Sequence, residues 1–316
     1  TGAKELDKLK GMHPVIEKLV EYREAAKLLS TYILPLPELA DEAGRIHTTF
    51  TQDVTATGRL SSVNPNLQNI PVRTEAGRRI RMGFVAPEGR CLVSADYSQF
   101  ELRLAAVLAG DENLIRDFNA GIDIHTKTAA EVFGVKMEEV TKQQRRAAKT
   151  INFGVLYGMS AKGLSEATGM TVPEAKEFID GYFEVRRPIR GYLDAVLRQA
   201  EEKGYVETYF GRRRPTPDVK SSNYVVREAA KRAAQNMPIQ GTEADLMKRA
   251  MIRIDEMLPE GAEMLLQVHD SVVIECDCER AEEIGEMVKG VMEGVAPELR
   301  IKLEVEVTKG RNWGEL

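Results

Sequence analysis

Residues 141–158 read Thr-Lys-Gln-Gln-Arg-Arg-Ala-Ala-Lys-Thr-Ile-Asn-Phe-Gly-Val-Leu-Tyr-Gly, and this stretch predicts a single helix. Thr141 and Gln144 have the spacing of a capping box, and Gly158 suits the left-handed residue that follows a helix. Four residues recur at every fourth position and would line one face over about 18 Å: Arg145, Lys149, Phe153 and Tyr157. Three residues would form the apolar back face: Ala147, Ile151 and Val155.

The polar face of this helix runs from two cations to two aromatic rings. That order suits a triphosphate followed by a sugar and a base. A solvated basic face beside core aromatics is the alternative interpretation of the same stretch. The helix alone does not distinguish the two, so the rest of the chain has to decide.

The composition is that of a globular protein without a membrane segment. The 316 residues leave room for about two domains, and 43% hydrophobic and 29% charged residues are ordinary values. There is no run of about 18 apolar residues and no secretion leader. Three cysteines are too few for a disulfide framework, so we expect a cytoplasmic protein in a reducing setting.

The net charge of −5 does not exclude a nucleic acid partner, because the basic residues are clustered. Arginine and lysine gather in three places, at 78–81, 145–149 and 212–214. Local patches, rather than the net charge, determine whether a protein binds phosphate groups. The acidic total is therefore uninformative about partners.

Both ends of the chain combine a helical pattern with strand patterns. Residues 14–31 predict a helix that ends before Pro35, and residues 91–96 predict a short apolar strand. Residues 263–276 predict two strands around a tight turn at His269-Asp270. A helix at 279–294 and a strand at 301–308 would complete a hairpin–helix–strand unit.

Helical patterns dominate the middle of the chain, from about 102 to 257. We expect this helical segment to break near Pro238, which would expose the amides of Asn236 and Gln240. The stretch 57–71 has no periodicity but carries apolar residues, which favours an ordered loop docked on the core.

Two aspartates occupy special positions. Asp96 ends the strand at 91–96, and Asp270 lies in the turn of the hairpin. If these strands are neighbours in one sheet, the two carboxylates converge and can hold a pair of Mg²⁺ ions about 4 Å apart for phosphoryl transfer. The alternatives are a helix N-cap for Asp96 and a turn former for Asp270.

Three motifs in this order resemble the family A DNA polymerases, the bacterial DNA polymerase I family. Residues 96–103, Asp-Tyr-Ser-Gln-Phe-Glu-Leu-Arg, resemble motif A. Residues 145–158 resemble motif B, and Val268-His-Asp-Ser271 resembles motif C. Further signatures match at 57–62, 65–71 and 240–242. The resemblance covers essentially the whole chain.

The resemblance implies an α+β fold of the right-hand polymerase type. An antiparallel β-sheet palm would carry a large, mostly helical fingers insertion. The implied domains are a residual thumb-base helix at 1–40, a first palm part at 41–100, fingers at 101–257 and a second palm part at 258–316. Most of the thumb and any exonuclease domain would be absent.

The resemblance also assigns roles to individual residues. Asp96 and Asp270 would be catalytic and would bind two Mg²⁺ ions with the Tyr97 carbonyl. Seven residues would contact the dNTP: Gln99, Glu101, His125, Arg145, Lys149, Phe153 and Tyr157. Five residues would contact DNA: Arg59, Arg232, Asn236, Gln240 and His269.

Glu101 has two interpretations. In the family, this position excludes the ribose 2′-hydroxyl and bonds the motif B tyrosine, whereas Ser98 and Glu101 together have the spacing of a capping box. Two departures from the family pattern are Ser271, where Glu is usual, and Phe100, where a smaller aliphatic residue is usual.

The sequence therefore predicts a DNA polymerase that adds dNTPs to a primer 3′-hydroxyl. Primer–template DNA and dNTPs would be its partners, without a membrane, and the protein would act as a monomer. One alternative is a single-subunit RNA polymerase-like enzyme, which Ser271 favours and Glu101 opposes. The other is a weakly active primer–template-binding fragment.

Overall fold

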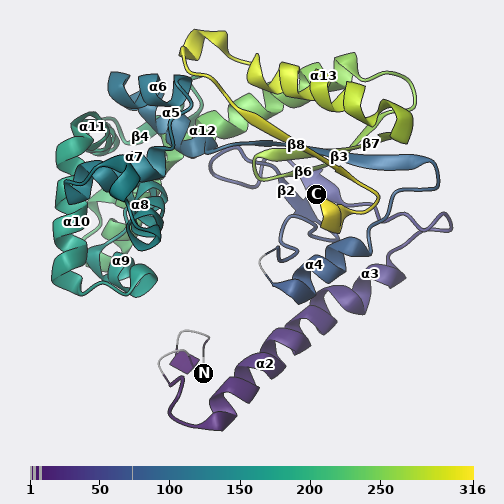
Figure 1. The fold of residues 1–316 in the computed structure, drawn as a ribbon, viewed down its shortest axis with the longest axis horizontal. Coiled ribbons are helices and arrows are strands. Elements are labelled where there is room, and N and C mark those ends of the chain that lie inside the picture. Colours follow the sequence, from purple (N-terminus) through teal and green to yellow (C-terminus); the bar gives the residue numbers. More distant parts are fainter. Residues whose placement is uncertain (1, 3–4, 7–8, 73) are drawn as a thin grey trace.

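The computed structural model describes residues 2, 5–6, 9–72 and 74–316 of the chain. An antiparallel sheet with a helix layer above it forms one part of the molecule, a body of helices lies beside it, and a long N-terminal helix extends below (Figure 1). The expected α+β class is confirmed. Within the described part of the chain, no helix combines the length and hydropathy needed to cross a bilayer.

The main sheet brings together strands from both ends of the chain. It contains β3 (Arg90–Tyr97), β6 (Glu263–Val268), β7 (Ser271–Asp277) and β8 (Val305–Gly310) in the order β6-β7-β3-β8, and every pairing is antiparallel. Asp96 is paired with Ser271, so the end of β3 meets the turn between β6 and β7. The condition stated for the convergence of Asp96 and Asp270, that their strands are neighbours in one sheet, is thus met.

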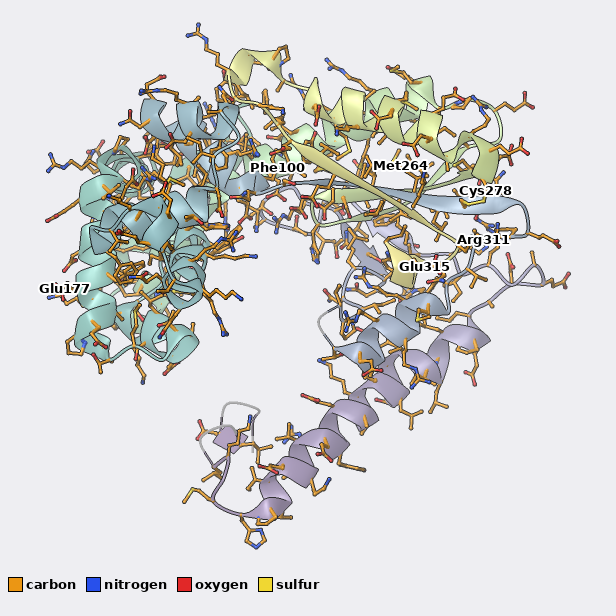
Figure 2. The ribbon with its side chains drawn as sticks, in the orientation of Figure 1. Phe100, Glu177, Met264, Cys278, Arg311 and Glu315 are labelled. Carbon is orange, nitrogen blue, oxygen red and sulfur yellow. A yellow bond between two sulfur atoms is a disulfide. The ribbon has the colours of Figure 1, made fainter. Side chains whose placement is uncertain are left out.

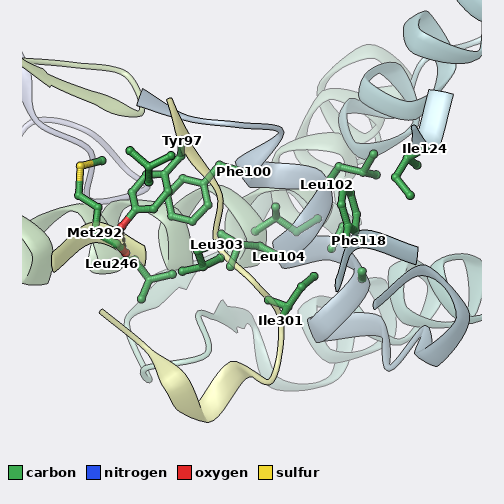
Figure 3. Close-up of a cluster of buried hydrophobic side chains, with 14 of the residues drawn as sticks. Tyr97, Phe100, Leu102, Leu104, Phe118, Ile124, Leu246, Met292, Ile301 and Leu303 are labelled. Atoms are coloured by element: carbon green, nitrogen blue, oxygen red, sulfur yellow. Dashed lines mark hydrogen bonds between the residues drawn. The ribbon is translucent and has the colours of Figure 1, made fainter. Parts of the chain in front are cut away.

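The two faces of this sheet pack on different cores, as the alternation of side chains along a strand requires. Val93, Ala95 and Tyr97 face α13 (Ala281–Glu293) and belong to the largest core cluster. That cluster continues into the helical body, as Figure 3 shows around Tyr97 and its neighbours. Leu92, on the opposite face, packs in a second cluster that contains Trp313.

The helical body follows β3 directly. Its helices are α5 (Phe100–Ala109), α6 (Glu112–Asn119), α7 (Ile124–Phe133), α8 (Lys142–Gly154), α9 (Ala161–Thr168), α10 (Val172–Val185), α11 (Arg187–Lys203) and α12 (Tyr224–Met257). A hairpin of β4 (Tyr205–Glu207) and β5 (Arg213–Pro215) lies before α12. The capping box between Thr141 and Gln144 is confirmed, because each backbone N–H bonds the other side chain.

The N-terminal part lies below the sheet. It contains α2 (Pro14–Leu28), α3 (Pro35–Glu38), α4 (Glu75–Met82) and a small hairpin of β1 (Thr49–Thr51) and β2 (Ser61–Val63). The predicted helix 14–31 does not end before Pro35: a π-helical turn, η1 (Leu29–Ile33), leads into α3, where Pro35 takes the first helical position. Proline is tolerated there because the first-turn N–H groups lack intrahelical partners.

Short 3₁₀ turns complete the element order. They are η2 (Met137–Glu139), η3 (Val155–Tyr157), η4 (Pro217–Lys220), η5 (Cys278–Arg280), η6 (Pro297–Leu299) and η7 (Trp313–Glu315). The docked loop at 57–71 is confirmed, because Leu67 and Ile70 are buried in the core below the sheet.

Two further helix predictions were wrong, one at its C-terminal end and one in its interior. The helix at 141–158 stops at Gly154, whose carbonyl accepts the Met159 N–H at 2.9 Å, and continues as the 3₁₀ turn η3. Ala147 and Ile151 are buried as predicted, while the side chain of Val155 lies outside the part that the structure describes.

The expected break near Pro238 is absent, because α12 runs unbroken for 34 residues. Pro238 is buried, and the Thr242 hydroxyl donates to its carbonyl at 2.6 Å. Burial on this scale offsets the one hydrogen bond that a helical proline removes. Asn236 and Gln240 are accordingly half-buried on a continuous helix rather than exposed at a break.

A disulfide joins Cys91 and Cys278 at one end of the sheet, although the cysteine count alone indicated a reducing setting without a disulfide framework. Arg311 donates to the Cys278 sulfur at 3.3 Å, and both side chains lie near that end in Figure 2. The register brings Cys91 opposite Cys276, which stays a free, buried cysteine. The pairing of Cys91 with Cys278 was not evident from sequence because the two lie 187 residues apart.

Candidate active site

Asp96 and Asp270 meet at the end of the sheet. The Tyr97 N–H donates to the Asp270 carbonyl at 3.2 Å, which fixes the end of β3 against the β6–β7 turn. His269 makes this turn possible by adopting a left-handed backbone with φ of 58°. The Asp270 carboxylate is close enough to disfavour the charge of Asp96. The predicted convergence of the two aspartates is therefore observed.

The two carboxylates disfavour each other's charge. Withdrawal from water raises the pKa of Asp96, and the neighbouring Asp270 and Glu306 raise it further. Burial likewise raises the pKa of Asp270, whereas His269 and Arg59 act in the opposite direction. A pair of repelling carboxylates is suited to binding a cation between them.

The donor set fits Mg²⁺, which prefers oxygen ligands and retains water and phosphate oxygens around one or two carboxylates. Among the residues that the structure describes, no group of three or more His, Cys, Asp or Glu side chains is arranged to hold a metal. The carboxylates that meet at the end of the sheet are those of Asp96 and Asp270. The predicted Tyr97 carbonyl ligand remains a prediction.

The two departures from the family pattern have structural roles. The Ser271 hydroxyl donates to the Val268 carbonyl at 2.9 Å and closes the hairpin. Phe100 is buried and stacks on Tyr97 with a centroid distance of 4.0 Å, as seen in Figure 3. The Tyr97 hydroxyl donates to the Met292 carbonyl at 2.7 Å. These contacts stabilise the chain immediately after Asp96.

Glu101 points into the site. Its carboxylate accepts the Tyr157 hydroxyl on both oxygens, at 2.5 Å for Oε1, and also accepts Arg59 Nη2 at 3.0 Å. The capping-box alternative is wrong, because Ser98 donates to Glu306 and α5 has Gln99 as its N-cap. The N-cap alternative for Asp96 is excluded for the same reason.

The two cations of α8, Arg145 and Lys149, lie near the buried His125 of α7. Arg145 Nε donates to Asp123 at 2.8 Å, and Lys149 is exposed. His125 is 4% exposed and its Nδ1 lies 3.0 Å from the Asn152 amide. Burial, helped by the charges of Arg145 and Lys149, lowers the pKa of His125 to about 4. The ring is therefore neutral at pH 7.

The aromatic residues continue this face. Phe153 is half-buried, with its ring centroid 5.8 Å from that of His125. Tyr157 lies on the 3₁₀ turn and is 43% exposed. The side chain of Arg232 packs against Gly158, where a Cβ would approach it to 2.7 Å. The structure thus brings Arg232 of α12 next to the end of the α8 segment.

Two amides near the site have buried atoms without a hydrogen-bond partner: Gln99 Oε1 and Asn236 Nδ2. Gln240 is half-buried on α12 and His269 is exposed beside Asp270. The predicted polar residues are thus distributed over α5, α12 and the β6–β7 turn.

The sequence did not reveal Glu243 and Asp123. Glu243, 1% exposed, binds Arg59, and Asp123 is the N-cap of α7 that holds Arg145. Asp123 precedes a helical pattern and was detectable as an N-cap. Glu243 gives no local signal, because its partner is 184 residues away.

The comparisons with known proteins decide the family. The family model for DNA polymerase family A matches residues 1–315. The chain belongs to DNA polymerase family A. It is 56% identical over 315 residues to the thermostable DNA polymerase I of Thermus aquaticus, covering 99% of this chain and 38% of that protein. It is 51% identical to DNA polymerase I of Deinococcus radiodurans, covering 33% of that protein.

A solved structure agrees with this family A assignment. It is described as the POL domain of Pol1 from M. smegmatis in complex with DNA primer-template and dNTP. The TM-score is 0.92 at 44% identity, with 100% of this chain and 56% of that chain covered. The right-hand fold that the sequence predicted is thus confirmed, whereas the chain spans only about two fifths of the length of the T. aquaticus relative.

Proposed function

We propose that this chain is a template-directed DNA polymerase that extends a primer. The observation that carries the proposal is the closeness of Asp96 and Asp270 at the end of the sheet, where Asp96 is paired with Ser271 and the Tyr97 N–H donates to the Asp270 carbonyl. Relatives named DNA polymerase I and a similar structure that holds primer-template and dNTP support it. In the reaction, the primer 3′-oxygen forms a bond to the α-phosphorus, the bond to the bridging oxygen breaks, and pyrophosphate leaves as the hydroxyl loses its proton.

Asp96, Asp270 and the Tyr97 carbonyl would hold two Mg²⁺ ions. When bound, these ions activate the attacking hydroxyl and stabilise charge on the leaving pyrophosphate. The mutual repulsion of the carboxylates supports this role, because a cation between them removes it.

Arg145, Lys149 and His125 would bind the triphosphate. Lys149 is exposed, and Arg145 would exchange its ion pair with Asp123 for phosphate oxygens. The neutral His125 donates or accepts a hydrogen bond without adding charge. Phe153 would stack on the nucleotide.

Glu101 and Tyr157 would control the sugar and template positions. Glu101 excludes a 2′-hydroxyl, Gln99 lies near the sugar, and Tyr157 occupies the template-base position before the nucleotide binds. The hydrogen bond from Tyr157 to Glu101 supports this pairing of roles. Five residues would contact the primer–template: Arg59, Arg232, Asn236, Gln240 and His269.

The proposed domain division follows the sequence boundaries. Residues 1–40 would be the base of the thumb, 41–100 and 258–316 the palm, and 101–257 the fingers. The palm assignment rests on the sheet that both palm segments share. The protein would act as a monomer on its substrate.

Primer extension tests the proposal. We expect the wild type to incorporate dNTPs in the presence of Mg²⁺, and Asp270→Asn to lower the rate by at least about a thousandfold. The matched control is Asp255→Asn, an exposed residue of α12, which should extend like the wild type. Equal rates for the wild type and Asp270→Asn would overturn the proposal, and efficient use of NTPs would favour the RNA polymerase-like alternative.

A further inference from the structure

Glu243 is a buried acid that the roles above do not use. It lies on α12, three residues after Gln240, and its side chain is 1% exposed. Withdrawing a carboxylate from water is strongly unfavourable unless it is paired and hydrogen-bonded. Burial accordingly raises the pKa of Glu243, and the guanidinium of Arg59 counteracts this. The fold therefore keeps a carboxylate at a position where its burial is unfavourable, and its contacts indicate a role.

Those contacts converge on one arginine. Arg59 Nε donates to Glu243 Oε1 at 3.1 Å, and Arg59 Nη2 donates to the same oxygen at 2.6 Å. Nη2 also donates to Glu101 Oε1 at 3.0 Å. The guanidinium is thus held between two carboxylates, and the second of these accepts the Tyr157 hydroxyl. One continuous polar chain links Glu243, Arg59, Glu101 and Tyr157.

The backbone around Arg59 is fixed independently of this polar chain. The Thr55 hydroxyl donates to the Arg59 carbonyl at 2.6 Å. α12 lies directly on the same loop: a Cβ on Gly241 would come within 3.2 Å of the Thr57 carbonyl. Since the loop and α12 are in contact, the position of Glu243 relative to the Arg59 backbone is set by packing. What Glu243 determines is the direction of the long arginine side chain.

Contacts at the guanidinium have to set this direction, because a free arginine side chain samples many rotamers. With Glu243 present, Arg59 shares its donors between two acids. With a neutral amide there, the guanidinium would pair more strongly with Glu101 and draw its carboxylate from the position in which it meets Tyr157.

We propose that Glu243 is a positioning residue, which acts through Arg59 to hold the Glu101 carboxylate where it selects the nucleotide sugar. This proposal rests on the DNA polymerase function proposed above. It assigns sugar selection to a set of four residues from α12, the loop before β2, α5 and η3. Glu243 itself does not touch the nucleotide.

The test is steady-state extension by Glu243→Gln with a dNTP and with the matching NTP. We expect the ratio of kcat/KM for dNTP over NTP to fall about tenfold, mainly because KM for dNTP rises. Glu256→Gln, an exposed glutamate on the same helix, should keep the wild-type ratio. A purely structural role for Glu243 would lower the melting temperature and leave the ratio unchanged, which would overturn the proposal.

A double-mutant cycle with Arg59→Ala separates action through Arg59 from direct action. We expect Glu243→Gln to produce no further loss of selectivity in the Arg59→Ala background, and an additive loss would overturn the proposal. If Glu243→Gln does not fold, Arg59→Lys serves instead, because it retains the charge but not the paired N–H donors of the guanidinium. It should show the same loss of selectivity for dNTP over NTP. No extension by the wild type would instead reject the proposed function itself.

Discussion

Asp96 and Asp270 are held together by the backbone although their charges repel each other. Burial, followed by the charge of Asp270, raises the pKa of Asp96, so the ionised Asp96 carboxylate destabilises the fold at neutral pH when no cation is bound. Asp96→Asn should therefore raise the melting temperature in chelator by on the order of 2 °C while extension is lost. The gain should shrink as the pH falls and the wild-type carboxylate takes up a proton.

Differential scanning calorimetry in EDTA at pH 7.5 and pH 5 measures this effect. Asp255→Asn is the control, because that exposed residue should not change the melting temperature. A lower melting temperature for Asp96→Asn at pH 7.5 would show that the two carboxylates do not repel in the folded chain.

His125 links stability to pH in a definite direction. Burial lowers its pKa to about 4, whereas the pKa of a histidine in the unfolded chain is about 6.5. Between these values, the unfolded chain binds a proton that the folded chain does not. The stabilisation is fully present above about pH 6.5 and is lost as the pH falls towards 4, by on the order of 3 kcal/mol.

Urea unfolding of the wild type and His125→Gln across this pH range tests the sign. For His125→Gln, the free energy of unfolding should fall less steeply as the pH decreases, because the contribution of the histidine is absent. Parallel stability curves for the two proteins between pH 6.5 and pH 4 would contradict the assignment of a neutral, buried ring.

At the level of elements, the Thr242 hydroxyl stabilises α12 next to its internal proline, Pro238. Thr242 donates to the Pro238 carbonyl at 2.6 Å and accepts the Tyr209 N–H at 3.0 Å. Thr242→Val keeps the shape but leaves that N–H without its acceptor. We expect a loss of about 1–3 kcal/mol in the free energy of unfolding.

Thr150→Val on α8 is the matched control for this substitution. The Thr150 hydroxyl also bonds a carbonyl of its own helix, that of Arg146, but at the surface. Its replacement should change the free energy of unfolding by less than about 0.5 kcal/mol. Equal losses for both variants would mean that the buried bond of Thr242 contributes nothing special.

The same elements show how far sequence reasoning reaches. Local signals predicted the start of α8 at Thr141 and the hairpin around Asp270, because caps and turns depend on a few adjacent residues. The break expected near Pro238 was wrong, since burial on all sides outweighs the local cost of proline. The Arg59–Glu243 pair was invisible, because nothing within either segment marks the other as its partner.

For the whole molecule, the important feature is the continuity of the core. The largest cluster includes Val93 of the sheet and Leu164 of α9 in the helical body. The second cluster, with Trp313, packs on the opposite face of the same strands through Leu92. Since both cores share β3, the sheet and the helical body should unfold together rather than as separate units.

Trp313 makes this cooperativity measurable, because it is the single tryptophan and is buried near Arg81 and Phe84. Its fluorescence follows the sheet side, whereas circular dichroism at 222 nm follows mostly the helical body. The two thermal transitions should coincide. Leu104→Ala would leave a cavity in the largest core cluster and lower the free energy of unfolding by about 2–5 kcal/mol. Both thermal midpoints should therefore fall by the same amount. A helical signal that melts at lower temperature than the Trp313 signal would show that the shared strands do not couple the two cores.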